Sequence, residues 1–132
     1  MVADSVISSG LEEFVNGSVG ASIVRYKKGY MNVINEARRL KASGVNAALA
    51  IETSGHSAFA DNGWLDDGTY SAVLACCEVK RRMQAGEGGV MAMIAGMREA
   101  GYEEEVRSGV EGAFVRIFLV DVSIALLVGS CA

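Results

Sequence analysis

The chain has 132 residues, 51% of them apolar, which suffices for one domain with a single core. Its 12 basic and 16 acidic residues give a net charge of −4 and form no basic stripe with interleaved aromatic rings, so nucleic acid is not an expected partner. The three cysteines match neither an even disulfide framework nor the paired spacing of a zinc site, which is typical of an intracellular protein with reduced thiols.

Strand and helix patterns alternate in the first third of the chain. Residues 2–6 are partly β-branched and predict a strand, and residues 11–15 predict a short helix that ends at Asn16 and Gly17. Residues 21–26 form the next strand-like cluster. Apolar side chains then recur at i, i+3, i+4 and i+7, the spacing of an amphipathic helix: Tyr30, Val33, Ile34 and Ala37. This order is typical of an α/β fold.

The amphipathic helix is expected to end near Gly44, a residue suited to the left-handed position that follows a helix. Arg38, Arg39 and Lys41 lie in its last turns, where they complement the negative end of the helix macrodipole, so we interpret them as solvated charges. Residues 47–51 are continuously apolar, as in a strand covered on both faces. We expect this strand at the centre of the sheet.

A long helix is predicted from about residue 66 to residue 85. Asp66 and Asp67 supply carboxylates that suit its amino-terminal cap, and basic residues lie near its end. Its inward side chains are predicted from their spacing: Tyr70, Val73, Leu74 and Cys77. The two aspartates are more simply capping residues than ligands of a bound molecule.

Cysteines, glycines and methionines near this helix have plain structural interpretations. Cys76 and Cys77 point in different directions from a helix, which favours core packing over a metal site. Residues 86–89 are a glycine-rich turn without the lysine and hydroxyl that a P-loop needs. Residues 90–100 resume a helical pattern, and its methionines are expected in the core: Met91, Met93 and Met97.

These elements predict the α/β fold class, as a three-layer α/β/α sandwich with a mixed sheet of about four strands. The core domain is expected to span residues 1–86. Residues 87–132 are expected to form a helix followed by an atypical extension, and residues 112–132 match no expected pattern.

Polar residues follow directly on the apolar strand, where open α/β sheets place their ligand crevices. Glu52 offers two acceptor oxygens, Ser54 a hydroxyl and His56 a tunable ring, while Gly55 supplies the turn that brings them together. This set suits a vicinal diol on a sugar. The alternatives are that Glu52 and Ser54 are turn and cap residues, and that His56 is a structural histidine.

The motif Glu-x-Ser-Gly-His at 52–56, followed by Phe59 and by Asp-Asp-Gly-x-Tyr at 66–70, resembles the sugar-binding loop signature of the alpha-D-phosphohexomutases, the phosphoglucomutase/phosphomannomutase superfamily. The resemblance is closest to the plant-type members and covers roughly residues 2–82. It extends backwards through three short segments: Asp4-Ser5-Val6, Gly10-Leu11 and Arg25-Tyr26-Lys27-Lys28-Gly29-Tyr30.

The resemblance implies that this region is the third, sugar-binding domain of a four-domain intramolecular phosphotransferase, an isomerase of carbohydrate metabolism. It implies that Glu52 and Ser54 bind sugar hydroxyls and that His56 shapes and protonates the same pocket. In the family a phosphoserine donates to one end of the hexose phosphate, the bisphosphate turns around, and the other phosphate is returned. A carboxylate and a hydroxyl aimed at two adjacent ring hydroxyls suit both orientations.

The family's other motifs are not found in the sequence: no phosphoserine loop, no magnesium loop and no terminal phosphate loop. We therefore expect no turnover by this fragment alone, no catalytic residue in it, and no metal or cofactor bound by it, with Mg²⁺ in the parent family held by a missing domain. The extension beyond residue 86 would lead toward a missing fourth domain. Tyr30 departs from the histidine of some relatives, and Val6 and Ile7 stand where some carry a lysine.

The expected partner is a hexose phosphate, namely glucose, mannose or glucosamine phosphate. The alternative function is a non-catalytic sugar-phosphate-binding or protein-assembly domain. The amino terminus carries no secretory signal pattern, and the apolar stretch at 117–128 is interrupted by Asp121 and is shorter than the roughly 20 residues of a membrane helix. The expected location is therefore intracellular, either the cytoplasm or a plastid, without membrane association.

Overall fold

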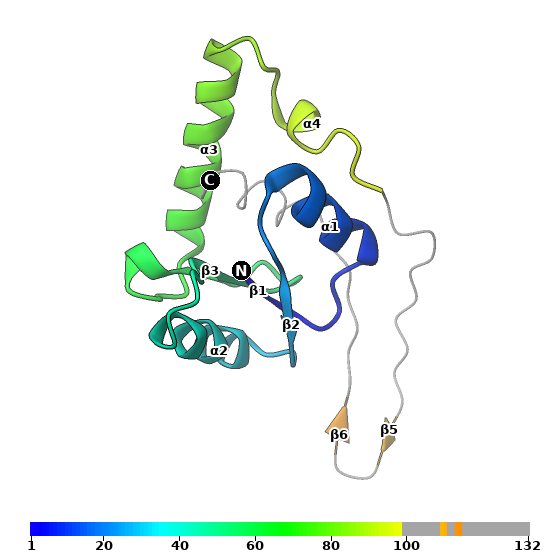
Figure 1. The fold of residues 1–132 in the computed structure, drawn as a ribbon, viewed down its shortest axis with the longest axis vertical. Coiled ribbons are helices and arrows are strands. Elements are labelled where there is room, and N and C mark those ends of the chain that lie inside the picture. Colours follow the sequence, from blue (N-terminus) through cyan, green and yellow to red (C-terminus); the bar gives the residue numbers. More distant parts are fainter. Residues whose placement is uncertain (99–108, 111–112, 115–132) are drawn as a thin grey trace.

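The computed structural model describes residues 1–98, 109–110 and 113–114, arranged as in Figure 1. Four short strands form one sheet: β1 (Val2–Asp4), β2 (Val24–Tyr26), β3 (Leu49–Ile51) and β4 (Ser57–Phe59). The helical elements are α1 (Ser9–Phe14), the π-helical turn η1 (Val15–Val19), α2 (Tyr30–Ala42), the 3-10 turn η2 (Ala60–Asn62), α3 (Gly68–Gln84) and α4 (Val90–Met93). Strands β5 (Gly109–Val110) and β6 (Ala113–Phe114) pair with each other in antiparallel register.

The order of the strands in the sheet is β2-β1-β3-β4. β1 pairs in parallel with β2 on one side and with β3 on the other, and β4 pairs antiparallel with β3. The predicted mixed sheet of four strands is confirmed, and the apolar strand β3 lies inside it as expected. Because β1, β2 and β3 are parallel, the loops that leave them start from one edge of the sheet.

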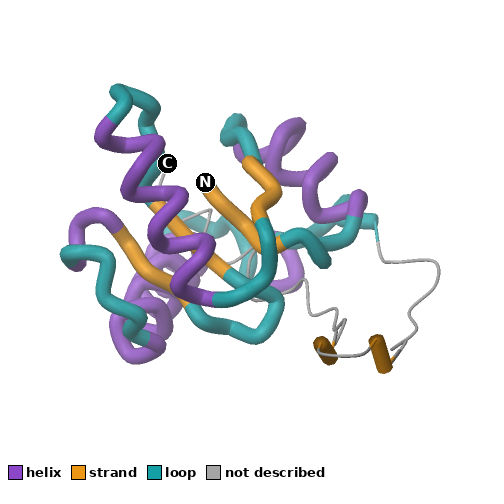
Figure 2. The backbone as a smooth tube through the Cα atoms, turned by 90° about the horizontal axis from the view of Figure 1, so that it is seen from below, coloured by secondary structure: helices purple, strands orange, loops and turns teal. Residues whose placement is uncertain are grey.

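Side chains of the strands alternate between two cores, one on each face of the sheet. The core beneath α1 has eight buried members: Ala3, Ile7, Leu11, Phe14, Val15, Leu49, Ile51 and Phe59. The core beneath α2 has six: Val2, Val33, Ile34, Ala37, Ala50 and Ala58. Tyr70 and Leu74 bring the first turns of α3 onto the α1 side. Helices thus flank the strands on both sides (Figure 2), which confirms the α/β/α layers.

The first helix does not end at Asn16 and Gly17, as the sequence analysis predicts. The chain continues as the π-helical turn η1, which ends at Gly20, whose N–H donates to the Val15 carbonyl. Val15 is fully buried and Val19 packs against the same core, so continued winding keeps both side chains on the sheet. This burial outweighs the turn preference of the Asn-Gly pair.

Helix α3 lies where it is predicted, but its inward face is different. Val73 is 55% exposed and Cys77 is exposed, whereas Leu74 packs against the core. The core interpretation of Cys76 is also wrong, because that side chain is exposed. The reason is that only the beginning of α3 contacts the sheet, and the rest of the helix extends past it (Figure 1).

The methionine-rich helix is shorter than predicted. α4 covers four residues, and Met91 at its start is 77% exposed, so its assignment to the core is wrong. Met97 does pack against the α1 core. The last residues of the predicted helix, the apolar stretch at 117–128 and most of the predicted carboxy-terminal extension lie outside the described residues. Among the residues described, no helix has the length and apolar character needed to cross a membrane.

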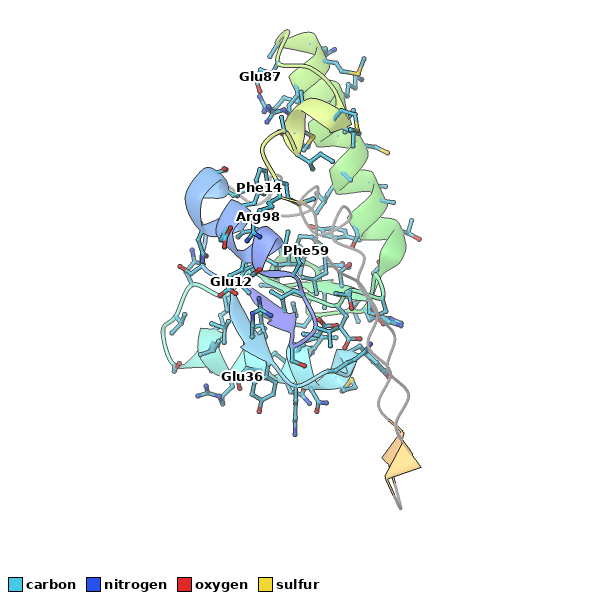
Figure 3. The ribbon with its side chains drawn as sticks, turned by 90° about the vertical axis from the view of Figure 1, so that its right-hand side faces the viewer. Glu12, Phe14, Glu36, Phe59, Glu87 and Arg98 are labelled. Carbon is cyan, nitrogen blue, oxygen red and sulfur yellow. The ribbon has the colours of Figure 1, made fainter. Side chains whose placement is uncertain are left out.

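Gly10 of α1 lies against the main chain of Arg98. A β-carbon added at Gly10 would stand 2.1 Å from the Arg98 carbonyl oxygen. Arg98 is held beside α1 (Figure 3), and its guanidinium pairs with Glu13 at 2.9 Å. We therefore expect Gly10→Ala to lower the free energy of unfolding by about 1–3 kcal/mol, the range for overpacked side chains, when measured by urea denaturation.

The matched control is Gly17→Ala in η1, where an added β-carbon meets no atom within 4 Å. Alanine also has a higher helix propensity than glycine, so this control should keep or slightly raise the stability. Equal destabilisation by the two variants would contradict the close contact between α1 and the segment that ends at Arg98.

Candidate functional site

Glu52 lies at the carboxyl end of β3, and its side chain is almost fully buried, with 4% of the residue exposed. One carboxylate oxygen accepts a hydrogen bond from the main-chain N–H of Gly29. The other oxygen accepts from the hydroxyl of Ser54 at 3.4 Å. The structure therefore brings together the first two predicted site residues and adds a third group, the loop that precedes α2.

The position of Glu52 also explains how α2 begins. Gly29 is the cap residue of that helix and has no side chain with which to cap it. The N-terminus of a helix carries a partial positive charge and unpaired N–H groups, which a nearby carboxylate stabilises. Glu52 supplies this carboxylate from another part of the chain, so it has a structural role in addition to any role in binding.

The site loop at 52–56 is a tight turn between β3 and β4. The N–H of Gly55 donates to the Glu52 carbonyl and the N–H of Glu52 donates to the His56 carbonyl, each at 2.9 Å. Gly55 has a φ of 92°, in the region that favours glycine. The turn leaves Ser54 and His56 exposed beside the buried carboxylate. The three predicted site residues thus share one small surface.

His56 is half exposed, and two neighbours hold its ring. Its Nδ1 lies 2.6 Å from a carboxylate oxygen of Asp66. The ring of Tyr30, from the first turn of α2, stacks on the imidazole with 5.3 Å between the centroids and 27° between the planes. Tyr30 is itself 44% exposed, so the stacked pair forms part of the surface beside Ser54.

Asp4 is a residue of the site that the sequence analysis does not assign. It is fully buried at the end of β1 and accepts two hydrogen bonds from Thr53, from its N–H at 3.2 Å and from its hydroxyl at 2.9 Å. Its other oxygen accepts from the N–H of Val6. A carboxylate at the end of a buried strand is the signal that could have indicated this anchor, since a buried charge needs partners.

Asp66 and Asp67 have different roles, although the sequence analysis interprets both as caps. Asp67 accepts hydrogen bonds from the N–H groups of Thr69 and Tyr70, so its capping role is confirmed. The bond from Tyr70, followed by those from Asn62 and Thr69, holds the pKa of Asp67 below its usual value against the opposing effect of desolvation. For Asp66 the capping interpretation is wrong, because its carboxylate contacts His56 and the N–H of Ser57.

Two cavities lie away from this site. One, of about 550 Å³, opens at the amino ends of the strands and is lined by residues such as Val24 and Leu49. Another, of about 640 Å³, lies along α3 next to Val79 and Met83. Neither is lined by an acidic side chain or by any of the three predicted site residues. Among the described residues, no group of three or more His, Cys, Asp or Glu side chains is arranged to hold a metal ion.

Comparison with known proteins gives one match. The family model described as phosphoglucomutase/phosphomannomutase, alpha/beta/alpha domain III, matches residues 1–100 of the 132 residues. The search of curated proteins finds no match, and the search of solved structures finds none either. The matched range contains the whole four-stranded sheet and every residue of the site loop.

Proposed function

This chain belongs to the phosphoglucomutase/phosphomannomutase family as its alpha/beta/alpha domain III, and from this membership we propose that it binds the sugar of a hexose phosphate through Glu52, Ser54 and His56. One observation carries the proposal. A buried carboxylate, an exposed hydroxyl and a half-exposed imidazole lie together at the carboxyl edge of the sheet, on a single tight turn. Ligands of open α/β sheets bind at this edge.

The hydrogen-bonding capacity of the turn suits a pair of sugar hydroxyls. A carboxylate offers about four lone-pair positions, and the two oxygens of Glu52 accept from the Gly29 N–H and from the Ser54 hydroxyl. In the proposed complex, a lone pair that these two bonds do not use accepts from a sugar hydroxyl. The Ser54 hydroxyl donates or accepts, so it adapts to either member of a vicinal pair. A hydrogen bond to a charged acceptor is stronger than a neutral one, which gives the carboxylate the larger share of the affinity.

Two lysines lie next in sequence to the glycine that Glu52 contacts. The loop that Glu52 holds through Gly29 carries Lys27 and Lys28 immediately before that glycine. Lysine meets phosphate as a mobile point charge on a flexible stem. In the proposed complex, this basic loop offsets part of the phosphate charge of a hexose phosphate whose hydroxyls face Ser54.

We propose that this domain contributes recognition to an intramolecular phosphotransferase and does not perform the phosphoryl transfer. Phosphoryl transfer depends on positioning and on stabilisation of charge by groups around the phosphate. The sequence contains none of the family's motifs for the phosphoserine, for Mg²⁺ or for the terminal phosphate loop. The proposal places any Mg²⁺ of the parent enzyme outside this domain.

The direct test is an NMR titration of the 132-residue chain with glucose 1-phosphate and with mannose 1-phosphate. We expect the amide signals of residues 53–57 to shift together on addition of either sugar, with inorganic phosphate as the control for charge alone. Ser54→Ala should weaken the binding roughly two- to tenfold, the range for loss of one hydrogen bond of about 0.5–1.5 kcal/mol. The expected change is a local one, because Ser54 is exposed.

The proposal would be contradicted if the chain is well folded and the amide signals of residues 53–57 do not shift at saturating sugar phosphate. It would favour the alternative, a domain for protein assembly. One observation supports that alternative: the helices at 68–93 expose Val73, Met83 and Met91 to solvent. Shifts that appear equally with inorganic phosphate would assign the site to phosphate and not to the sugar.

A further inference from the structure

The ring of His56 is fixed more firmly than an exposed histidine requires. Its main-chain carbonyl closes the tight turn through the N–H of Glu52, Asp66 contacts Nδ1, and the Tyr30 ring covers one face. Exposed side chains lose rotamer freedom when they are held, so such an arrangement costs conformational entropy. Two contacts on the imidazole, together with the fixed main chain, indicate that its orientation matters for what it binds.

The Asp66 carboxylate contacts two groups, and one of them, the main-chain N–H of Ser57, can only donate a hydrogen bond. One oxygen of its carboxylate accepts from the N–H of Ser57 at 3.2 Å, and the other lies 2.6 Å from His56 Nδ1. The backbone of Asp66 is itself fixed, because it bridges to Ala58 of β4. An ionised carboxylate only accepts hydrogen bonds, so Nδ1 must carry the proton in this contact. In the neutral imidazole, Nε2 is then an acceptor.

We propose that Asp66 is a positioning residue that holds the proton of the neutral His56 ring on Nδ1, so that Nε2 accepts a hydrogen bond from a sugar hydroxyl. The stacked Tyr30 fixes the plane of the ring for that contact. Nε2 is the only ring nitrogen left for a ligand, because Nδ1 is occupied by Asp66. This inference rests on the proposed function for the identity of the ligand, while the position of the proton depends only on Asp66.

The position of the proton is measurable in the wild-type chain without any ligand. Imidazole ¹⁵N spectra distinguish the protonated ring nitrogen from the unprotonated one. At about pH 9, where a free imidazole is almost entirely neutral, we expect the Nδ1–H tautomer to exceed the Nε2–H tautomer roughly tenfold. Free imidazole side chains favour neither form so strongly. A wild-type spectrum dominated by Nε2–H would overturn the inference.

Asp66→Asn should invert this preference. Asparagine has one acceptor oxygen and one NH₂ donor in place of two acceptors. The Ser57 N–H can only donate, so it takes the oxygen, and the NH₂ group is then turned toward His56. Nδ1 must accept from that group, which moves the ring proton to Nε2. The matched control is Asp61→Asn, an exposed aspartate of η2, which should leave the tautomer as in the wild type.

Addition of glucose 1-phosphate separates this inference from the proposed function. We expect the wild-type Nε2 signal to shift together with the amides of residues 53–57. Amide shifts without a change at Nε2 would leave sugar binding in place and overturn the role of His56 as an acceptor. If neither the Nε2 signal nor the amide signals shift, the result counts against the proposed function and against the sugar contact of Nε2. The tautomer spectra recorded without ligand would still decide the role of Asp66.

Discussion

Asp4→Ala is expected to lower the free energy of unfolding by about 3–5 kcal/mol, more than any other substitution at the site. The side chain of Asp4 is fully buried and receives three hydrogen bonds, one from Val6 and two from Thr53. Each buried donor that loses its acceptor costs about 1–3 kcal/mol. A domain of this size is stable by only about 5–15 kcal/mol, so urea denaturation should show a large fall in the midpoint.

Asp4 also connects β1 to the loop that follows β3. Thr53 lies between Glu52 and Ser54 in the turn, and its main-chain N–H is one of the groups that Asp4 holds. In Asp4→Ala the amides of residues 52–56 should therefore lose their protection from hydrogen exchange before the rest of the sheet does. The loop is predicted to loosen even in molecules that remain folded.

Two further variants make this prediction specific. Asp61→Ala removes an exposed aspartate and should change the stability by less than about 0.5 kcal/mol. Thr53→Val removes only the hydroxyl donor, so its cost should be smaller than that of Asp4→Ala, and combining the two should be less than additive. An Asp4→Ala protein as stable as Asp61→Ala would show that the buried hydrogen bonds are not formed in solution.

The sequence predicts the architecture well because apolar periodicity reports burial directly. The apolar run at 47–51 and the spacing from Tyr30 to Ala37 place β3 and α2 correctly. The prediction fails in part for α3: Val73 lies beside the inward face that Ser71 and Leu74 form, and Cys77 is exposed where the helix extends past the sheet. Periodicity indicates which residues share a face of a helix, and it does not indicate how far along the helix a neighbouring layer extends.

The candidate site is predictable only in part for a similar reason. Glu52, Ser54 and His56 are adjacent in the chain, so their association on one turn follows from the motif. Asp4 and Tyr30 reach the same site from elements far away in the sequence, through contacts that only the folded topology creates. The sequence predicts a cap at Asp66 because it precedes a helix, but Asp66 bridges to Ala58 of β4 and its carboxylate contacts His56.

Replacing the carboxylate by an amide is expected to have opposite consequences at Glu52 and at Asp66. Each carboxylate serves a main-chain N–H with one oxygen and a side chain with the other. At Asp66 the side-chain partner is an imidazole, whose proton must move if the carboxylate becomes an amide. At Glu52 the partner is the Ser54 hydroxyl, which reverses its donor role by rotation. The fold should therefore tolerate an amide at Glu52.

Glu52→Gln is accordingly expected to impair binding far more than folding. The glutamine oxygen can accept from the Gly29 N–H, and its NH₂ group can donate to the Ser54 hydroxyl, so the protein contacts are kept. The loss of negative charge at the start of α2 should cost about 0.3–1 kcal/mol of stability. A sugar hydroxyl loses a charged acceptor, which should weaken the affinity for glucose 1-phosphate by about 1.5–3 kcal/mol, or roughly 10- to 150-fold, in the NMR titration.

The control for this substitution is Glu13→Gln, which removes one negative charge from an exposed side chain on α1 that pairs with Arg98. It should leave the affinity within about twofold of the wild type, since an exposed ion pair contributes about 0–1 kcal/mol and only to stability. If Glu52→Gln binds sugar phosphate as tightly as Glu13→Gln does, Glu52 serves only to cap α2. A fall in affinity that is larger than the fall in stability would assign the Glu52 carboxylate to the sugar. Loss of a helix cap that makes no ligand contact would lower the stability alone.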